Sequence, residues 1–206
     1  MRQQCFCSLV LAALFLAPRL IAAPEALRAH THEGVVYTSD QTWSGNMSLD
    51  ENVVIASGAT LLIESGTHIN VTEDITITIQ GNLQIQGTTE NPVTVWGSWF
   101  AENSVQARWQ GFLLDSGSVT SVMHAMISDS RGGFDVESGA SLTIESTHFS
   151  DSMIGVWNKG SMTGAGFECQ SATTTCLRVD GTAYLDTVIS SNLSLIHISE
   201  PTRQIR

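Results

Sequence analysis

The sequence predicts an all-β protein, a parallel β-helix whose coils contain about 22 residues each. Three observations predict this fold. Short segments alternate between apolar and polar residues, glycines recur at an almost constant spacing, and one tetrapeptide pattern recurs at the same spacing. A unit of this size cannot bury its apolar side chains alone, so stacked units must share one continuous core.

The repeat is clearest in the second half of the 206-residue chain. Four glycines open similar segments at intervals of 22, 21 and 21 residues: Gly117, Gly139, Gly160 and Gly181. The sequence Ile-Ser-Asp-Ser at 127–130 returns as Phe-Ser-Asp-Ser at 149–152, an offset of 22. We therefore expect Ile127 and Phe149 to lie over each other on neighbouring coils.

The expected strands are short. Four segments carry β-branched residues or leucine at every second position, the period of a strand with one buried face: 59–64, 75–79, 82–86 and 141–145. Glycine, serine, aspartate and asparagine separate the runs, and these residues favour turns. An antiparallel sandwich also consists of short strands, but it does not explain a tetrapeptide pattern that recurs at a fixed offset.

Composition excludes several classes of protein. Hydrophobic residues make up 42% of the chain, which is too many for intrinsic disorder. The formal net charge of −11 argues against binding to nucleic acid or to anionic lipid, because both need a basic surface. We expect no nucleic-acid partner, and no membrane insertion of the mature chain.

The N-terminal segment 1–23 has the pattern of a secretory signal peptide. Arg2 supplies the positive charge, and residues 5–17 form an apolar run too short to span a bilayer comfortably. A membrane anchor is the alternative, although Arg19 interrupts the run. We expect a secreted or cell-surface protein, with a disordered leader at 24–33.

The C-terminal segment 193–206 breaks the repeat abruptly. Residues 193–203 resemble, codon by codon, the translation of a transposase sequencing adapter. A genuine C-terminal strand is the alternative. On the adapter interpretation the native sequence stops near Asn192, the β-helix domain at 34–192 is incomplete, and His197 and Glu200 belong to no site.

Several segments carry a resemblance to a known fold family: 42–46, 53–61, 63–67, 81–88, 90–94 and the Trp-Gln-Gly-Phe sequence at 109–112. They resemble secreted right-handed parallel β-helix proteins of the pectin-lyase-like superfold. The resemblance implies entry strands at 34–56 that cap the helix, first coils at 57–95, an insertion at 96–108 and regular coils at 109–192. This superfold contains lyases, hydrolases, adhesins and plain scaffolds, so it predicts the fold more specifically than the function.

The insertion is the best candidate for a binding surface. Trp96, Trp99 and Phe100 could stack on a sugar ring or anchor a protein partner. Packing of the insertion as a lid over a coil is the alternative interpretation. Trp109 belongs to a Trp-x-Gly-Phe pattern that is typical of a structural role in these proteins.

Two pairs of residues suggest further sites. Asp129 and Asp151 are one repeat apart and could share a Ca²⁺ ion, but two carboxylates do not fill six to eight oxygen positions. The alternative is that each aspartate bonds to backbone N–H groups in its turn, and we expect neither a metal nor another cofactor. Cys169 and Cys176 are expected to form a disulfide in an oxidising compartment, with two buried thiols as the alternative.

The sequence contains no clear catalytic motif. Arg131, Lys159 and Arg178 are expected at different phases of the coil, and Asp135 with Glu137 forms either an acid pair on one strand or a coil corner. The interpretation we favour is a secreted scaffold that is not catalytic in this region and binds an extracellular polysaccharide or a surface protein. The alternative is the N-terminal part of a polysaccharide lyase or glycoside hydrolase whose catalytic coils are missing. A third possibility is the passenger domain of an autotransporter.

Overall fold

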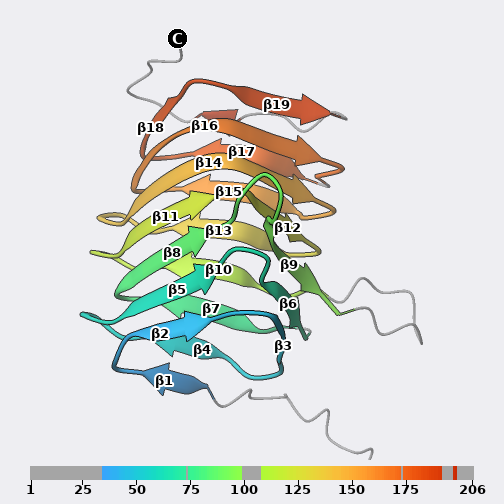
Figure 1. Cartoon of the computed structure of the whole chain (residues 1–206). Helices are drawn as coiled ribbons and strands as arrows, with labels where there is room; N and C mark the ends of the chain where they lie inside the picture. Colours follow the sequence, from blue (N-terminus) through green and yellow to red (C-terminus); the bar gives the residue numbers. More distant parts are fainter. Residues whose placement is uncertain (1–33, 73, 99–107, 173, 192–196, 199–206) are drawn as a thin grey trace, which may run out of the picture. The chain divides into compact units, whose positions relative to one another are not determined.

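A computed structural model describes residues 34–72, 74–98, 108–172, 174–191 and 197–198 (Figure 1). In these residues the chain forms strands and turns only, with no helix, and therefore no helix long and apolar enough to cross a membrane. Parallel strands stack in a β-solenoid of about 7 turns with about 22 residues per turn. The predicted fold class is confirmed.

Three strands form each turn, and the first four turns have separate strands on every face. Their bounds are β1 (Val35–Tyr37), β2 (Gln41–Trp43), β3 (Asn46–Leu49), β4 (Val53–Ile55), β5 (Thr60–Glu64), β6 (His68–Val71), β7 (Thr76–Ile79), β8 (Asn82–Gln86), β9 (Val93–Gly97), β10 (Gly111–Leu114), β11 (Val119–Met123) and β12 (Ala125–Ser128). The later strands are β13 (Gly132–Val136), β14 (Ser141–Ser150), β15 (Ile154–Asn158), β16 (Ser161–Gln170), β17 (Thr175–Val179), β18 (Thr182–Leu185), β19 (Val188–Ser191) and β20 (His197–Ile198).

The strands form two sheets in which every described pairing is parallel. One sheet has 8 strands in the order β1-β4-β7-β10-β13-β15-β17-β20, and we call it sheet 1. The other has 12 strands and two arms, because β14 and β16 bend and pair on both sides of the bend. The first arm contains β5, β8 and β11, and the second contains β6, β9 and β12. Neighbours that all run the same way exclude the antiparallel sandwich.

The register of the strands follows the repeat in the sequence. Ile127 in β12 pairs directly with Phe149 in β14, as the offset of the tetrapeptide predicts. Phe134 in β13 likewise pairs with Val156 in β15. Each residue therefore lies over its counterpart one turn away, and the inward-facing positions form columns that run through the solenoid.

Apolar columns fill the interior. One aliphatic column in sheet 1 consists of Ile55, Ile79, Leu114 and Val136, all buried. An aromatic column begins at Trp109 and Phe112, and the rings of Phe112 and Phe134 stack with centroids 5.0 Å apart. Full burial of each such ring contributes about 1.5–3 kcal/mol, so the stacked core is the main source of stability.

The corners explain the glycine spacing. At Gly139 the backbone has φ 89°, a left-handed conformation that residues with a Cβ atom avoid. At Gly81 the cause is space, because a Cβ atom would lie 2.1 Å from the carbonyl oxygen of Ala59 on the preceding turn. Each regular glycine meets one of these two constraints: Gly117 also has a left-handed backbone, and a Cβ atom at Gly160 or Gly181 would lie 2.4 or 2.2 Å from a carbonyl oxygen of the preceding turn.

Residues 34–56 contain β1 to β4, which pair in the same parallel way as the later strands. The start of the expected insertion is regular structure, since Trp96 and Gly97 belong to β9 and pair with β6.

Residues 197–198, within the segment that resembles an adapter, lie beside β17 as β20. Backbone pairing of two residues depends little on side chains, so the adapter origin stays a prediction, and the predicted signal peptide and leader lie outside the described residues.

Candidate functional site

Trp96 lies on the outer surface of the second arm. Its strand β9 alternates, with Val93 and Val95 buried in the core and Thr94 and Trp96 facing outward. Trp96 is 36% exposed, which is a high value for tryptophan, the residue type with the largest side chain. Trp99 and Phe100, the other two predicted binding residues, lie outside the described residues.

Polar groups surround Trp96 on this face. The imidazole of His68 meets the indole edge to face, with ring centroids 6.3 Å apart, and its Nδ1 hydrogen-bonds to Thr94 Oγ1. Asn70 pairs with Trp96 across the strands, and its Oδ1 accepts a hydrogen bond of 2.6 Å from Ser98 Oγ. We call the surface formed by His68, Asn70, Thr94, Trp96 and the exposed Met126 the Trp96 face. An exposed indole among hydrogen-bonding side chains is suited to contact with a sugar ring or a partner protein.

Asp129 and Asp151 occupy equivalent corners of neighbouring turns. Both have left-handed backbones, with φ 55° and 51°, which aspartate tolerates better than most residues. Ser128 Oγ donates a 2.9 Å hydrogen bond to Asp129 Oδ2. Among the residues that the structure describes, no group of three or more His, Cys, Asp or Glu side chains gathers to hold a metal ion. The backbone conformation accounts for aspartate at this corner.

Arg108 is buried at the same corner, with an exposed fraction of 6%. Its guanidinium donates to the carbonyl oxygen of Ser130 on the next turn and to that of Asp151 one turn further. Next to it, the indole of Trp109 is fully buried and donates to the carbonyl oxygen of Ser128 at 2.9 Å. Arg108 therefore links three successive turns. The sequence does not reveal this role, because nothing in the repeat distinguishes a buried arginine from an exposed one.

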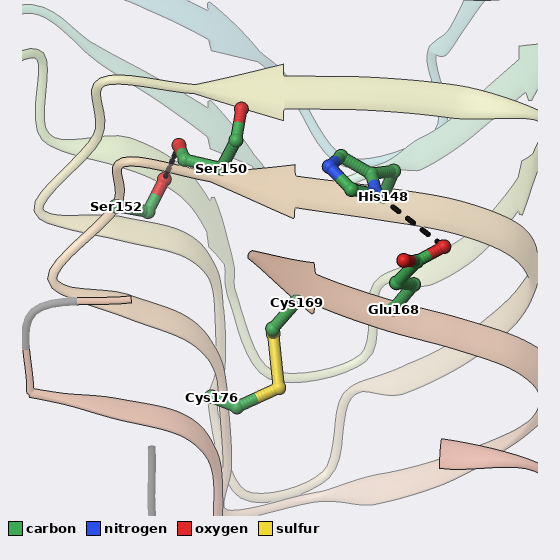
Figure 2. The surroundings of a disulfide bond; sticks show 6 residues. All are labelled: His148, Ser150, Ser152, Glu168, Cys169 and Cys176. Carbon is green, nitrogen blue, oxygen red and sulfur yellow. Dashed lines mark hydrogen bonds and ion pairs between the residues drawn. A yellow bond between two sulfur atoms is a disulfide. The ribbon is translucent and has the colours of Figure 1, made fainter. Parts of the chain in front are cut away.

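Cys169 and Cys176 are joined by a disulfide that connects β16 to β17 (Figure 2). Both residues are fully buried, and their Cα atoms are 5.8 Å apart. Cys169 pairs with Phe149 of the preceding turn. The disulfide therefore occupies the place in the core column that the ring of Phe149 occupies one turn earlier. On the outer surface of β14 and β16, His148 Nδ1 lies 3.5 Å from Glu168 Oε2.

A charged cluster lies on the outer surface of sheet 1. We call it the Trp157 cluster, and it consists of Asp135, Glu137, Trp157, Lys159, Arg178 and Asp180. Lys159 Nζ lies 2.9 Å from Asp135 Oδ1 and 2.5 Å from Glu137 Oε1. Burial lowers the pKa of Lys159, but its hydrogen bonds to Glu137 and Asp135 outweigh burial and hold this pKa above the ordinary value of 10.5.

Cations from two turns contact the indole of Trp157. Lys159 Nζ lies 4.1 Å from the ring centroid and is also bonded to the preceding turn, while the Arg178 guanidinium, from the following turn, lies 4.3 Å away. The indole N–H donates to Asp180 Oδ2 at 2.7 Å, and Arg178 Nε binds the same oxygen at 3.0 Å. Such a network holds three turns together through cation–π contacts and ion pairs.

The interpretation of Asp135 as a coil corner was wrong. Asp135 lies within strand β13 and not at a corner, because its outward position alternates with the buried Phe134 and Val136. Lys159 and Arg178 occupy different phases of the coil, as expected, because Arg178 pairs with Trp157 and Lys159 lies two residues further on, yet both contact the ring of Trp157. Offsets of 22 and 21 residues place Asp135, Trp157 and Arg178 in one outward column. The repeat spacing, applied to outward positions as well as to core positions, could have found the cluster.

Comparison with known proteins does not extend this description. No protein-family model, no curated protein sequence and no solved structure matches the chain.

Proposed function

We propose that this chain is a β-solenoid scaffold of a secreted or cell-surface protein, related to the pectin-lyase-like superfold, that binds extracellular polysaccharide through the Trp96 face. The observation that carries the proposal is the exposed indole of Trp96 on a rigid strand, with His68 and Thr94 beside it. Aromatic rings supply a large contact area at a small cost in conformational entropy, and neighbouring polar groups fix the orientation of a sugar.

Two features support secretion. The N-terminal segment has the pattern of a signal peptide. In addition, the disulfide between Cys169 and Cys176 belongs to an oxidising compartment, because cytosolic thiols are kept reduced.

The charges on sheet 1 support a scaffold in preference to a catalyst. Asp135 lies in β13 and Glu137 directly follows that strand, and both carboxylates are bonded to Lys159. A general acid and a general base need carboxyl groups in different environments, with one of them able to give up a proton. Ion pairs to a single ammonium group give both carboxylates the same structural role.

Affinity electrophoresis tests the proposal. The chain is run through native gels that contain cell-wall or extracellular polysaccharides, and retardation reports binding. We expect Trp96→Ala to weaken the retardation while Tyr184→Ala, which removes a 50% exposed aromatic side chain on the first arm, leaves it unchanged. Equal retardation of Trp96→Ala and the unmodified chain would show that the Trp96 face does not bind the polymer.

A further inference from the structure

The first arm carries a groove that neither the Trp96 face nor the Trp157 cluster includes. It is an open groove of about 680 Å³ on the outer surface of β8 and β11. The side chains that matter for its chemistry are Gln84, Gln86, Thr88, Val119, Ser121 and Met123. Strands supply most of these residues, so the groove is held more rigidly than a site built on loops.

The shape of the groove follows from the size of its side chains. Ser121 lies in register between Gln84 on β8 and Thr143 on β14, and its short side chain leaves a depression. Val119 and Met123 lie at the two ends of β11, with exposed fractions of 56% and 40%. The floor of the groove is therefore polar, and its ends are apolar.

The groove offers paired donors and acceptors. Gln86 Nε2 donates to Gln84 Oε1 at 3.1 Å, which leaves an amide donor on Gln84 and an acceptor on Gln86. The Ser121 hydroxyl both donates and accepts. Hydroxyl groups of a ligand also donate and accept, so a hydroxyl-rich chain matches this pattern.

Electrostatics exclude an anionic ligand. None of the residues that line the groove is charged. At one end two exposed carboxylates flank it, because Glu64 pairs with Gln86 and Glu145 pairs with Met123. The net charge of the chain is also −11. A uronic-acid chain or a nucleic acid would meet like charge here.

Addition of a peptide strand is excluded as well. The backbone groups of β8 are bonded to β5 and β11, and those of β11 are bonded to β8 and β14. Recognition of an extended peptide by strand addition needs an unpaired sheet edge. A ligand in this groove must therefore be bound through side chains.

We infer that this groove binds an uncharged oligosaccharide. Gln84, Gln86 and Ser121 hydrogen-bond to its hydroxyl groups, and Val119 and Met123 contact the C–H faces of its rings. The inference rests on the proposed function, from which it takes saccharide as the kind of ligand. It adds that the chain has a second binding surface and that the sugar bound there is uncharged.

Isothermal titration calorimetry with the full chain tests the inference. The probes are neutral hexasaccharides of β-1,4-glucan, α-1,4-glucan and β-1,4-xylan, together with hexagalacturonate as the acidic probe and hexalysine as the cationic one. We expect binding of at least one neutral probe and no binding of hexagalacturonate. Gln84→Glu, which removes an amide donor, and Ser121→Arg, which fills the depression, should each weaken binding at least about tenfold.

Two controls separate this inference from the proposed function. Gln170→Glu makes the same chemical change at an exposed glutamine on the second arm and should leave the affinity unchanged. Trp96→Ala should retain binding of the hexasaccharide while its retardation by the polymer is weakened. Unchanged affinity in Gln84→Glu and Ser121→Arg, a preference for hexagalacturonate or hexalysine, or no binding of any neutral probe would overturn the inference. Retardation that depends on Trp96 would still support the proposed function in each of these cases.

Discussion

The ring of Phe149 lies against the backbone of Gly133, so close that a Cβ atom on Gly133 would stand 2.3 Å from the ring. Glycine at this position is required by the neighbouring aromatic side chain, since its φ is not in the left-handed region. The same arrangement follows one turn later, where a Cβ atom on Gly155 would lie 2.9 Å from Cys169 Sγ. In both turns, therefore, a side chain from the next strand fills the space beside the glycine: Phe149 beside Gly133, and Cys169 beside Gly155.

Gly133→Ala should therefore destabilise the solenoid. Overpacking of a full core costs about 1–3 kcal/mol, and we expect the free energy of unfolding to fall by that amount. Urea denaturation followed by circular dichroism measures the change. The adjacent Gly132→Ala is the matched control, because its Cβ atom would meet nothing closer than the Gln110 carbonyl oxygen at 3.8 Å. Equal stability of the two variants would contradict the packing argument.

The disulfide between Cys169 and Cys176 should stabilise the last described turns. It closes a loop with a sequence separation of 7, and restraint of such a loop contributes about 2–3 kcal/mol. Replacement of both cysteines with alanine should lower the free energy of unfolding by this amount and should make it insensitive to dithiothreitol. If the unmodified chain melts at the same temperature with and without reductant, the disulfide contributes nothing.

Thr120→Val should make the protein more stable. Thr120 lies in a core column between Leu83 and Leu142, and its hydroxyl has no hydrogen-bond partner among the described residues. Valine has the same shape without the unpaired polar group, so we expect a gain of about 1 kcal/mol in the free energy of unfolding. Thr143→Val is the control, because Thr143 is exposed and its hydroxyl is bonded to that of Thr163. A lower melting temperature for Thr120→Val would disprove the prediction.

Lys159 should confer stability that depends on pH. Its pKa is raised in the folded state, so its contribution is complete below the unfolded value of about 10.4 and is lost as the pH rises through the folded pKa. Lys159→Met should cost about 1 kcal/mol near neutral pH. The difference in the free energy of unfolding between Lys159→Met and the unmodified chain should vanish once the pH exceeds the folded pKa of Lys159. Denaturation between about pH 8 and about pH 12 measures it.

Arg131→Met provides the comparison for Lys159. Arg131 is paired with Asp74 at 3.4 Å, and both side chains are about half exposed, so this pair should contribute less. A guanidinium also stays protonated across the range, so the effect of Arg131→Met should not change with pH. A Lys159→Met difference that is flat across the same range would rule out the assigned role of Lys159.

The winding of the chain follows from patterns in the sequence. Alternating residues and the offset of 22 are one-dimensional patterns, and both the pairing of Ile127 with Phe149 and the corner position of Gly139 follow from them. Only inward positions and corners obey such patterns, because burial and backbone strain restrict which residues they accept.

The stacking of the turns in three dimensions brings together outward and polar groups from different phases of the coil. The contact of Lys159 with Trp157 and the burial of Arg108 depend on how far these side chains reach across neighbouring turns, which the repeat spacing does not give. Outward positions tolerate most residues, so hydrophobic patterning carries no information about their neighbours. Stacking of the turns brings these side chains within bonding distance, and the Trp96 face and the groove beside Ser121 exist only once that stacking has occurred.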